Sequence, residues 1–293
     1  MSTSVNTNTN TNTKNTFIFI DGSYFCFYRY HSLLTWWKNA YPENPLDDPY
    51  QNEQFVAKFK KTFVENIQKI KKNLGLPKTS NPTIIVGKDC KREDIWRNEL
   101  FSKYKANRAN GAEDGFMGGP FFKMAYQDNL FIDGGATTIL KHPKLEADDC
   151  IALTVKHIVQ KYKDSNTPYN IYIITSDKDY LQLAEPCVHI YNLGFKKITD
   201  QKSSTGSAEC DLFCKIIMGD LSDNIPSVFP KCGPKTALKY YENKAEFQKK
   251  LESSDIFISQ YNINKKIVDF NEIPMDLSCE FFSTHEAVIN GLL

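Results

Sequence analysis

The sequence of 293 residues predicts an α/β fold, with a mostly parallel central sheet flanked by helices. Four short runs of β-branched and aromatic residues are continuous rather than alternating, which is typical of strands buried on both faces of a parallel sheet. These runs cover residues 17–20, 83–87, 171–175 and 188–191. Helical patterns separate them, and this alternation favours right-handed crossover connections.

Apolar residues recur every three or four positions over 53–73 and 145–163, which predicts two amphipathic helices. Residues 109–120 contain four glycines and a proline, so we expect a mobile loop there. A further helix is expected over 208–219, and only helical patterns follow it. The stripes consist of Phe55, Phe59, Phe63 and Ile67 in the first helix and of Ile151, Val155, Ile158 and Tyr162 in the second.

The chain divides by composition into three parts. Residues 1–16 form an Asn/Thr-rich tract with almost no apolar side chain, which predicts a disordered tail. Residues 17–206 contain the strands and are expected to form the α/β core. Residues 207–293 are expected to form a helical subdomain whose C-terminal end returns to the core.

Composition excludes several classes of protein. With 41% hydrophobic and 13% aromatic residues and a net charge of +1, the chain as a whole cannot be disordered. No run approaches the ~18–20 apolar residues of a membrane-spanning helix, and the N-terminus shows no secretory signal, so we expect no membrane association. The 8 cysteines are spread along the chain, which predicts reduced thiols and an intracellular protein whose compartment is left open.

Arginine is rare and concentrated in one segment. Three of the four arginines, Arg92, Arg97 and Arg108, lie between positions 92 and 108. Because the planar guanidinium binds phosphate through two hydrogen bonds, this concentration indicates phosphate recognition. A solvated helix face of mixed charge is the alternative interpretation.

Nine carboxylates lie where an open parallel sheet places its ligands, beyond the carboxyl ends of the strands and at neighbouring helix ends. Oxygen ligands without histidine or thiol partners select hard cations, so we expect Mg²⁺ or Mn²⁺. Nine acids exceed the needs of one such ion, which favours a pair about 4 Å apart. Taken singly, each acid has an alternative as a helix cap, a turn residue or a helix-dipole partner. The nine are Asp21, Asp89, Glu146, Asp148, Asp149, Asp177, Asp179, Asp220 and Asp223.

Five motifs, in order over about 17–277, resemble those of the 5′-nuclease superfamily of flap endonucleases and 5′→3′ exonucleases. The resemblance implies a PIN-like nuclease core followed by a helix–three-turn–helix subdomain that binds DNA. It also implies that about 103–130 form an arch or gateway over the active site. The motifs are Ile20-Asp21-Gly22-Ser23, the Tyr104–Arg108 segment YKANR, Glu146-Ala147-Asp148-Asp149, the Thr175–Leu183 segment TSDKDYLQL, and Gly219–Pro226 with Gly233–Ala237.

The resemblance further implies roles for individual residues. Asp21, Asp89, Glu146 and Asp148 would hold one metal ion, and Asp149, Asp177, Asp179, Asp220 and Asp223 would hold the second, partly through waters. Lys105 and Arg108 would act on the scissile phosphate as catalytic residues, and Arg97 would contact the nucleic-acid backbone or brace the site. Phosphate contacts of the helical clamp would come from Lys231, Gly233, Lys235, Thr236 and Lys239.

Members of the family bind K⁺ through backbone carbonyls of this clamp, and here Lys231 replaces the first glycine of its Gly-x-Gly turn. This replacement affects the expected K⁺ site more than the expected contacts with phosphate. Residues 38–52, rich in Pro and Asn, look like an insertion. No motif for a sliding clamp and no polymerase domain is recognisable, so we expect a stand-alone, monomeric nuclease.

The resemblance implies a structure-specific 5′ nuclease that acts on DNA 5′ ends, flaps or nicks with two metal ions and leaves a 5′-phosphate and a 3′-hydroxyl. Two alternatives stay open. One is cleavage of the RNA strand of RNA–DNA hybrids, because sequence does not reveal contacts to the 2′-hydroxyl. The other is an inactive DNA-binding scaffold, against which the retained acids and basic pair argue.

Overall fold

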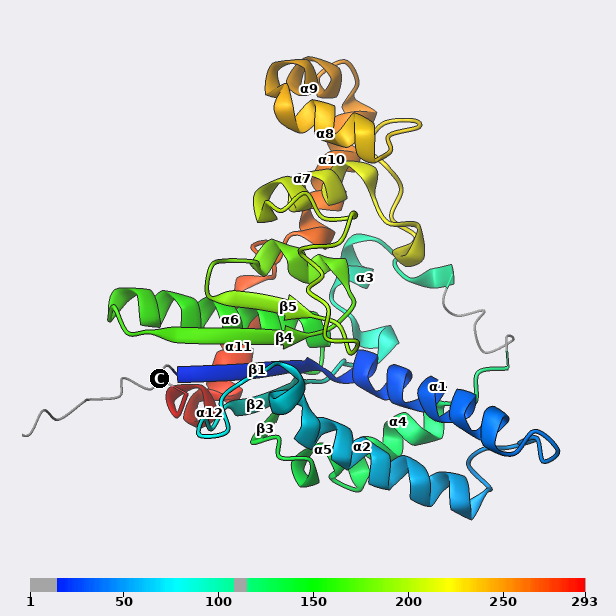
Figure 1. Ribbon diagram of the computed structural model, residues 1–293. Helices are drawn as coiled ribbons and strands as arrows, with labels where there is room; N and C mark the ends of the chain where they lie inside the picture. The colour runs from blue at the N-terminus through cyan, green and yellow to red at the C-terminus, as the bar shows by residue number, and fades with distance from the viewer. Residues whose placement is uncertain (1–14, 108–114, 293) are drawn as a thin grey trace, which may run out of the picture.

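The computed structural model describes residues 15–107 and 115–292. Within these residues, five strands form one sheet in the order β3-β2-β1-β4-β5, and every neighbouring pair is parallel (Figure 1). The predicted α/β fold with a parallel central sheet is therefore confirmed. The strands are β1 (Asn15–Asp21), β2 (Thr83–Gly87), β3 (Thr138–Leu140), β4 (Tyr169–Ile174) and β5 (Val188–Tyr191).

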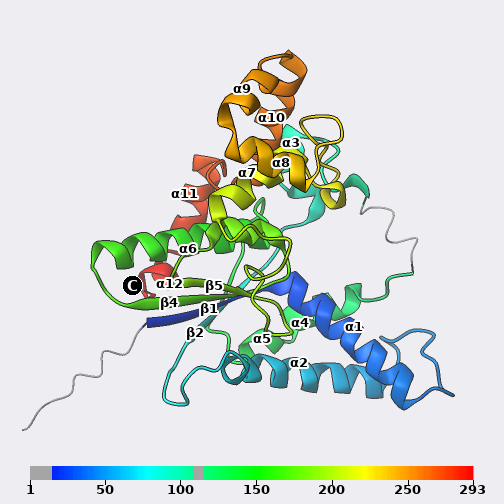
Figure 2. The same ribbon diagram turned by 45° about the horizontal axis from the view of Figure 1, so that its top comes forward.

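Helices cover both faces of the sheet, which explains why its strands are apolar without alternation (Figures 1 and 2). Ile18 and Ile20 of β1 face one layer, and Phe17 and Phe19 face the other. The first layer contains α1 (Gly22–Ala40), α2 (Glu53–Asn73), α4 (Gly119–Gln127) and α5 (Leu130–Asp133). The second contains α6 (Ala147–Asp164), η3 (Lys178–Leu183), α11 (Met275–Thr284) and α12 (Glu286–Asn290).

A third apolar cluster lies beyond the sheet, where helices from the C-terminal part of the chain form a separate arm (Figure 1). Ile95 and Tyr104, from the segment that contains η1 (Arg92–Asp94) and α3 (Arg97–Leu100), are buried in this cluster. The segment therefore joins the arm to the core. The arm consists of α7 (Ala208–Met218), η4 (Leu221–Asp223), α8 (Pro234–Glu242), α9 (Lys244–Leu251) and α10 (Asp255–Val268).

The observed elements differ from the predicted ones mainly at their ends. β1 begins at Asn15, inside the tract 1–16 predicted to be a tail, because its backbone continues the pairing with β4. β3 was not predicted, since its three residues are too few to show a pattern. Residues 38–40 of the supposed insertion extend α1, and α4 begins within the predicted loop 109–120. None of the described helices combines the length and apolarity needed to cross a bilayer.

Candidate active site

Three neighbouring strands deliver carboxylates to the same edge of the sheet. Asp21 is the last residue of β1, Asp89 follows the end of β2, and Asp177 follows the end of β4. Asp21 also caps α1, since its side chain accepts hydrogen bonds from the Tyr24 backbone N–H (3.0 Å) and the Thr175 hydroxyl (3.1 Å). The strand ends are thus fixed to one another through the acid itself.

The N-terminus of α6 brings three more acids to this edge. Glu146 is the N-cap residue, and Asp149 completes a capping box with it. Asp89 accepts hydrogen bonds from the Ala147 backbone N–H (2.7 Å) and from the Ser23 hydroxyl. One carboxylate therefore connects the end of β2 to the starts of both α1 and α6.

These residues surround an open pocket of about 490 Å³ at the carboxyl edge of the sheet. Six of the nine predicted acids line it, and Asp149, Asp179 and Asp223 are not among its lining residues. Lys105 and Lys215 reach the same pocket, the first from the base of the predicted arch and the second from α7. The lining acids are Asp21, Asp89, Glu146, Asp148, Asp177 and Asp220.

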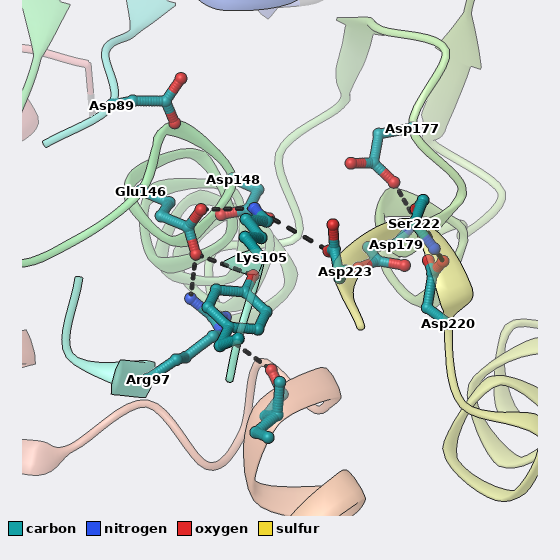
Figure 3. Close-up of polar contacts among 12 residues, drawn as sticks. Asp89, Arg97, Lys105, Glu146, Asp148, Asp177, Asp179, Asp220, Ser222 and Asp223 are labelled. Carbon is teal, nitrogen blue, oxygen red and sulfur yellow. Dashed lines mark hydrogen bonds and ion pairs between the residues drawn. The ribbon is translucent and has the colours of Figure 1, made fainter. Parts of the chain in front are cut away.

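Arg97 is a buried counter-ion and not a surface residue (Figure 3). Its side chain is 2% exposed, and its guanidinium contacts both Asp149 oxygens at 2.7 Å and Glu146 at 3.1 Å. The Ile267 carbonyl accepts from its Nε (2.8 Å), so α10 also depends on it. The prediction that Arg97 contacts nucleic acid directly is wrong, because the side chain is enclosed, whereas bracing of the site agrees with these contacts.

Asp149 is satisfied by protein donors alone. Besides Arg97, the Trp96 indole (3.0 Å) and the Glu146 backbone N–H (3.1 Å) donate to its Oδ2. Although one of its oxygens lies within 4.8 Å of oxygens of Glu146 and Asp148, the carboxylate is wholly buried and outside the pocket lining. These contacts favour an indirect part for Asp149, and its share in holding the second ion, partly through waters, stays a prediction.

Glu146 is neutralised by neighbouring bases. It accepts from Lys105 (2.5 Å), from the Tyr104 hydroxyl (3.0 Å) and from Arg97. Burial alone would raise the pKa of Glu146, but Lys105 and Arg97 outweigh this and hold it below its usual value. Tyr104 and Trp96 were not predicted as site residues, although Tyr104 is the first residue of the YKANR motif.

Four other carboxylates lack such compensation. Among the described residues, no ion pair is formed by Asp21, Asp89, Asp148 or Asp177. Burial and then Asp89 raise the pKa of Asp21 to about 7, and burial and then Asp179 raise the pKa of Asp177 to about 6. Burial likewise raises the pKa values of Asp89 and, more strongly, Asp148. The pocket therefore holds more carboxyl groups than the described basic side chains can neutralise.

Asp148 connects two groups of oxygens that can hold a metal ion. It lies within 4.8 Å of Glu146 and Asp149 in one group and of Asp177 and Asp179 in the other. Figure 3 shows Asp89 and Glu146 on one side of it and Asp177, Asp179 and Asp220 on the other. Oxygen-only ligands with uncompensated charge fit hard divalent cations.

Lys215 pairs with the far side of the acidic group and was not predicted. Its ammonium contacts Asp179 Oδ1 at 2.6 Å and also Asp220. Burial raises the pKa of Asp220, but the Lys215 ammonium and the Ser222 hydrogen bonds have the larger effect and lower this pKa to about 2. Nothing in the sequence distinguishes Lys215 from the many other helical lysines. Its position beside Asp179 follows from the packing of α7 against η3.

The base of the predicted arch is fastened to the loop that carries Asp220 and Asp223. The Lys105 backbone N–H donates to the Asp223 carbonyl (2.9 Å), and Asn107 donates to the Leu221 carbonyl (2.8 Å). In return, Asn224 donates to the Lys103 carbonyl (2.8 Å). The Lys105 ammonium is thereby held beside Glu146 and 3.9 Å from Asp223. The other predicted catalytic residue, Arg108, lies outside the described residues.

The predicted clamp lies on the arm, at the start of α8. Gly233 is the N-cap of α8 and Pro234 its first residue, so the N–H groups of the first turn lack intrahelical acceptors. Lys231, Lys235 and Thr236 are exposed there. Lys231 has φ of +58°, the conformation for which a glycine is favoured. Lys239 is paired with Glu246 at 2.8 Å.

Comparison with known proteins gives concordant matches. Residues 16–210 match the family described as 5′-3′ exonuclease, N-terminal resolvase-like domain. The 5′-3′ exonuclease of Mycoplasmopsis pulmonis is 30% identical over 258 residues, covering 80% of either chain. The ribonuclease H of Enterobacteria phage T4 is 28% identical over 229 residues, covering 72% of either chain.

Solved structures show the same fold. A bacteriophage T5 flap endonuclease, in a pseudo-enzyme–product complex with DNA and metal ions, aligns with a TM-score of 0.63 and 18% identity over 94% of this chain and 100% of that one. A T5 5′-exonuclease with bound zinc ions aligns with a TM-score of 0.61 and 17% identity, again over 94% and 100%.

Replacement of Arg97 by Met should lower the free energy of unfolding by about 3–5 kcal/mol, because two buried carboxylates lose their counter-ion. Urea unfolding followed by circular dichroism measures this. Arg92→Met, at an exposed position in the preceding turn, is the matched control and should change stability by less than about 0.5 kcal/mol. Equal effects of the two substitutions would contradict the bracing role.

The raised pKa of Asp21 predicts that metal-free protein loses stability with rising pH. An acid whose pKa is higher in the folded state stabilises the fold at pH values below its unfolded pKa and ceases to do so as pH passes the folded value, here about 7. From pH 5.5 to 8 in EDTA this contribution falls by about 2 kcal/mol. Asp21→Asn should therefore exceed the wild type in stability at pH 8 by more than it does at pH 5.5. A difference between the two proteins that does not change with pH would contradict this assignment.

Proposed function

The chain belongs to the 5′-3′ exonuclease family and is a nuclease, and we propose that it is a structure-specific 5′ nuclease that hydrolyses DNA phosphodiesters at 5′ ends or flaps. The observation that carries this proposal is the set of four carboxylates without ion pairs among the described residues, which line one pocket beside Lys105. Such a pocket repels a phosphodiester unless cations fill it. Divalent ions would balance the carboxylates and would also let the phosphodiester approach, as metal-dependent nuclease chemistry requires.

We infer that Mg²⁺ or Mn²⁺ is held in two positions. Asp21, Asp89, Glu146 and Asp148 would hold one ion; Asp148, Asp177 and Asp179 would hold the other, with Asp220 and Asp223 acting through waters. When bound, such ions lower the pKa of the attacking water and stabilise negative charge on the attacking and leaving oxygens. Asp149 would act indirectly, by orienting Arg97 and the start of α6.

Lys105 would neutralise the scissile phosphate. Its ammonium lines the pocket, and although burial would lower its pKa, Tyr104 and Glu146 raise that pKa well above the usual value. The group therefore stays charged throughout the working pH range, as electrostatic stabilisation of the transition state requires. Arg108, three residues further along the same segment, is proposed for the same role. Hydrolysis would leave a 5′-phosphate and a 3′-hydroxyl.

The arm would bind the duplex backbone beside the pocket. Backbone N–H groups at the start of α8 and the exposed Lys231, Lys235 and Thr236 provide donors suited to phosphates. Lys239 would first have to leave Glu246. In the family this turn also binds K⁺, and the positive φ of Lys231 supports a turn with the backbone of the glycine form.

A second candidate substrate is the RNA strand of an RNA–DNA hybrid. The relative from phage T4 that bears the name ribonuclease H supports this candidate. Cleavage of end-labelled flap, nicked, blunt and hybrid substrates in Mg²⁺, Mn²⁺ or EDTA separates the two. Preferred cutting of DNA flaps or 5′ ends supports the main proposal, and preferred cutting of hybrids supports the second. Cutting that persists in EDTA would count against both.

Replacement of Asp148 by Asn should reduce metal-dependent cleavage at least about 100-fold, because Asp148 contributes to both oxygen groups. Binding of duplex DNA, measured by fluorescence anisotropy in Ca²⁺, should change less than about threefold. Asp200→Asn, at an exposed position outside the pocket lining, is the control and should retain activity. Parallel loss of binding and cleavage would contradict a metal-binding role for Asp148.

Replacement of Lys235 by Ala should weaken DNA binding and reduce the slope of log K against log salt by about 1, because one phosphate contact and its released counter-ion are lost. Anisotropy titrations from 50 to 200 mM KCl measure the slope. Lys61→Ala, at an exposed position of α2 in the layer next to the sheet, removes the same charge away from the arm. Equal slopes in all three proteins would remove the case for the clamp.

A further inference from the structure

Lys215 holds a position between two acids of the pocket. It lies in the last turn of α7, and its ammonium contacts Asp179 Oδ1 at 2.6 Å while it also pairs with Asp220. Burial would lower the pKa of Lys215, yet Asp179 and Asp220 raise it above its usual value, so the group is charged. A side-chain cation therefore occupies the side of the pocket where Asp148, Asp177 and Asp179 bring their oxygens together.

Lys215 differs from Arg97 in how firmly it is held. Arg97 has a side chain that is 2% exposed and contacts two acids and a backbone carbonyl. Lys215 has a side chain that is 19% exposed, at the pocket wall, and a flexible four-carbon stem. Its partners are also more accessible, at 14% for Asp179 and 20% for Asp220. Lys215 can thus swing away without unfolding its surroundings, which Arg97 cannot.

We propose that Lys215 is a displaceable counter-ion, which occupies the cation position at Asp179 and Asp220 and has to leave before a divalent ion binds there. The inference rests on the proposed function, because it assumes that the pocket binds divalent ions. It makes binding sequential: the oxygens of Asp21, Asp89 and Asp148, which have no ion pairs among the described residues, bind the first ion. The second ion then binds more weakly, because it competes with Lys215.

The charges of the site require this order. A divalent ion that contacts Asp179 would lie close to the Lys215 ammonium, and the two cations would repel each other in this partly buried site. Asp179 and Asp220 together carry two negative charges, of which Lys215 already balances one. Without a second ion Lys215 stabilises these acids, and with one it must move toward the pocket mouth. Lys215 thus stabilises the folded arrangement of Asp179 and Asp220 until the second ion binds.

Calorimetric titration of the metal-free full-length protein with Mn²⁺ alone tests the inference. The wild type should bind two ions with distinct dissociation constants. In Lys215→Met the weaker constant should fall at least about tenfold, while the tighter one stays within threefold. Lys215→Arg, which keeps the charge, should resemble the wild type. Lys178→Met removes another pocket lysine, for which the described residues show no ion pair, and should leave both constants unchanged.

Thermal unfolding gives a second readout that does not depend on activity. Without metal, Lys215→Met should unfold at a lower temperature than the wild type at pH 8, and saturating Mn²⁺ should remove that difference. A deficit that persists in Mn²⁺, together with an unchanged weaker constant, would overturn the inference. Lys215→Gln serves the same test if Lys215→Met does not fold. If the wild type itself binds no Mn²⁺, the proposed function fails, and not only the role of Lys215.

Discussion

The crowding of carboxylates at one sheet edge is the constraint on which the rest of the site depends. Parallel strands end together, so Asp21, Asp89 and Asp177 are brought close by the same geometry that makes the sheet. Burial of so many like charges would unfold the edge if all were ionised without compensation. The protein responds with hydrogen bonds to the acids, with raised pKa values, and with a small number of buried cations.

These cations divide the acids into three kinds. Arg97 permanently neutralises Asp149 and much of Glu146, and by also binding the Ile267 carbonyl it connects the start of α6 to the helical arm. Lys105 and Lys215 form ion pairs with Glu146 and Asp179 at the pocket wall. The remaining acids have no basic partner among the described residues. The acids of the site therefore differ chiefly in their counter-ions, and those without one are all proposed to hold metal ions.

The fold and the location of the site could be predicted from the sequence because both follow from repeating local patterns. Continuous apolar runs identify buried parallel strands, and the acids that follow them identify the edge where they meet. The assignment of Arg97 to nucleic acid failed because burial of a polar side chain depends on packing between Ile95, Tyr104 and α10, which no local pattern encodes. The role of Lys215 could not be predicted for the same reason, since its partners lie on η3 and in the loop after α7.

Two further connections between the arm and the pocket involve the loop after α7 and α7 itself. The loop of Asp220 and Asp223 hydrogen-bonds to residues 103–107 at the base of the predicted arch. Helix α7, which carries Lys215, contacts η3 of the core as well as α8 and α10 of the arm. A ligand that moves the start of α8 would act on α7 through their shared apolar core. Such a shift would alter the Lys215 pairs before it reached the sheet, because β1, β2 and β4 are locked by parallel pairing. On the function proposed above, α7 is the helix at which the DNA-binding arm and the weaker metal position meet.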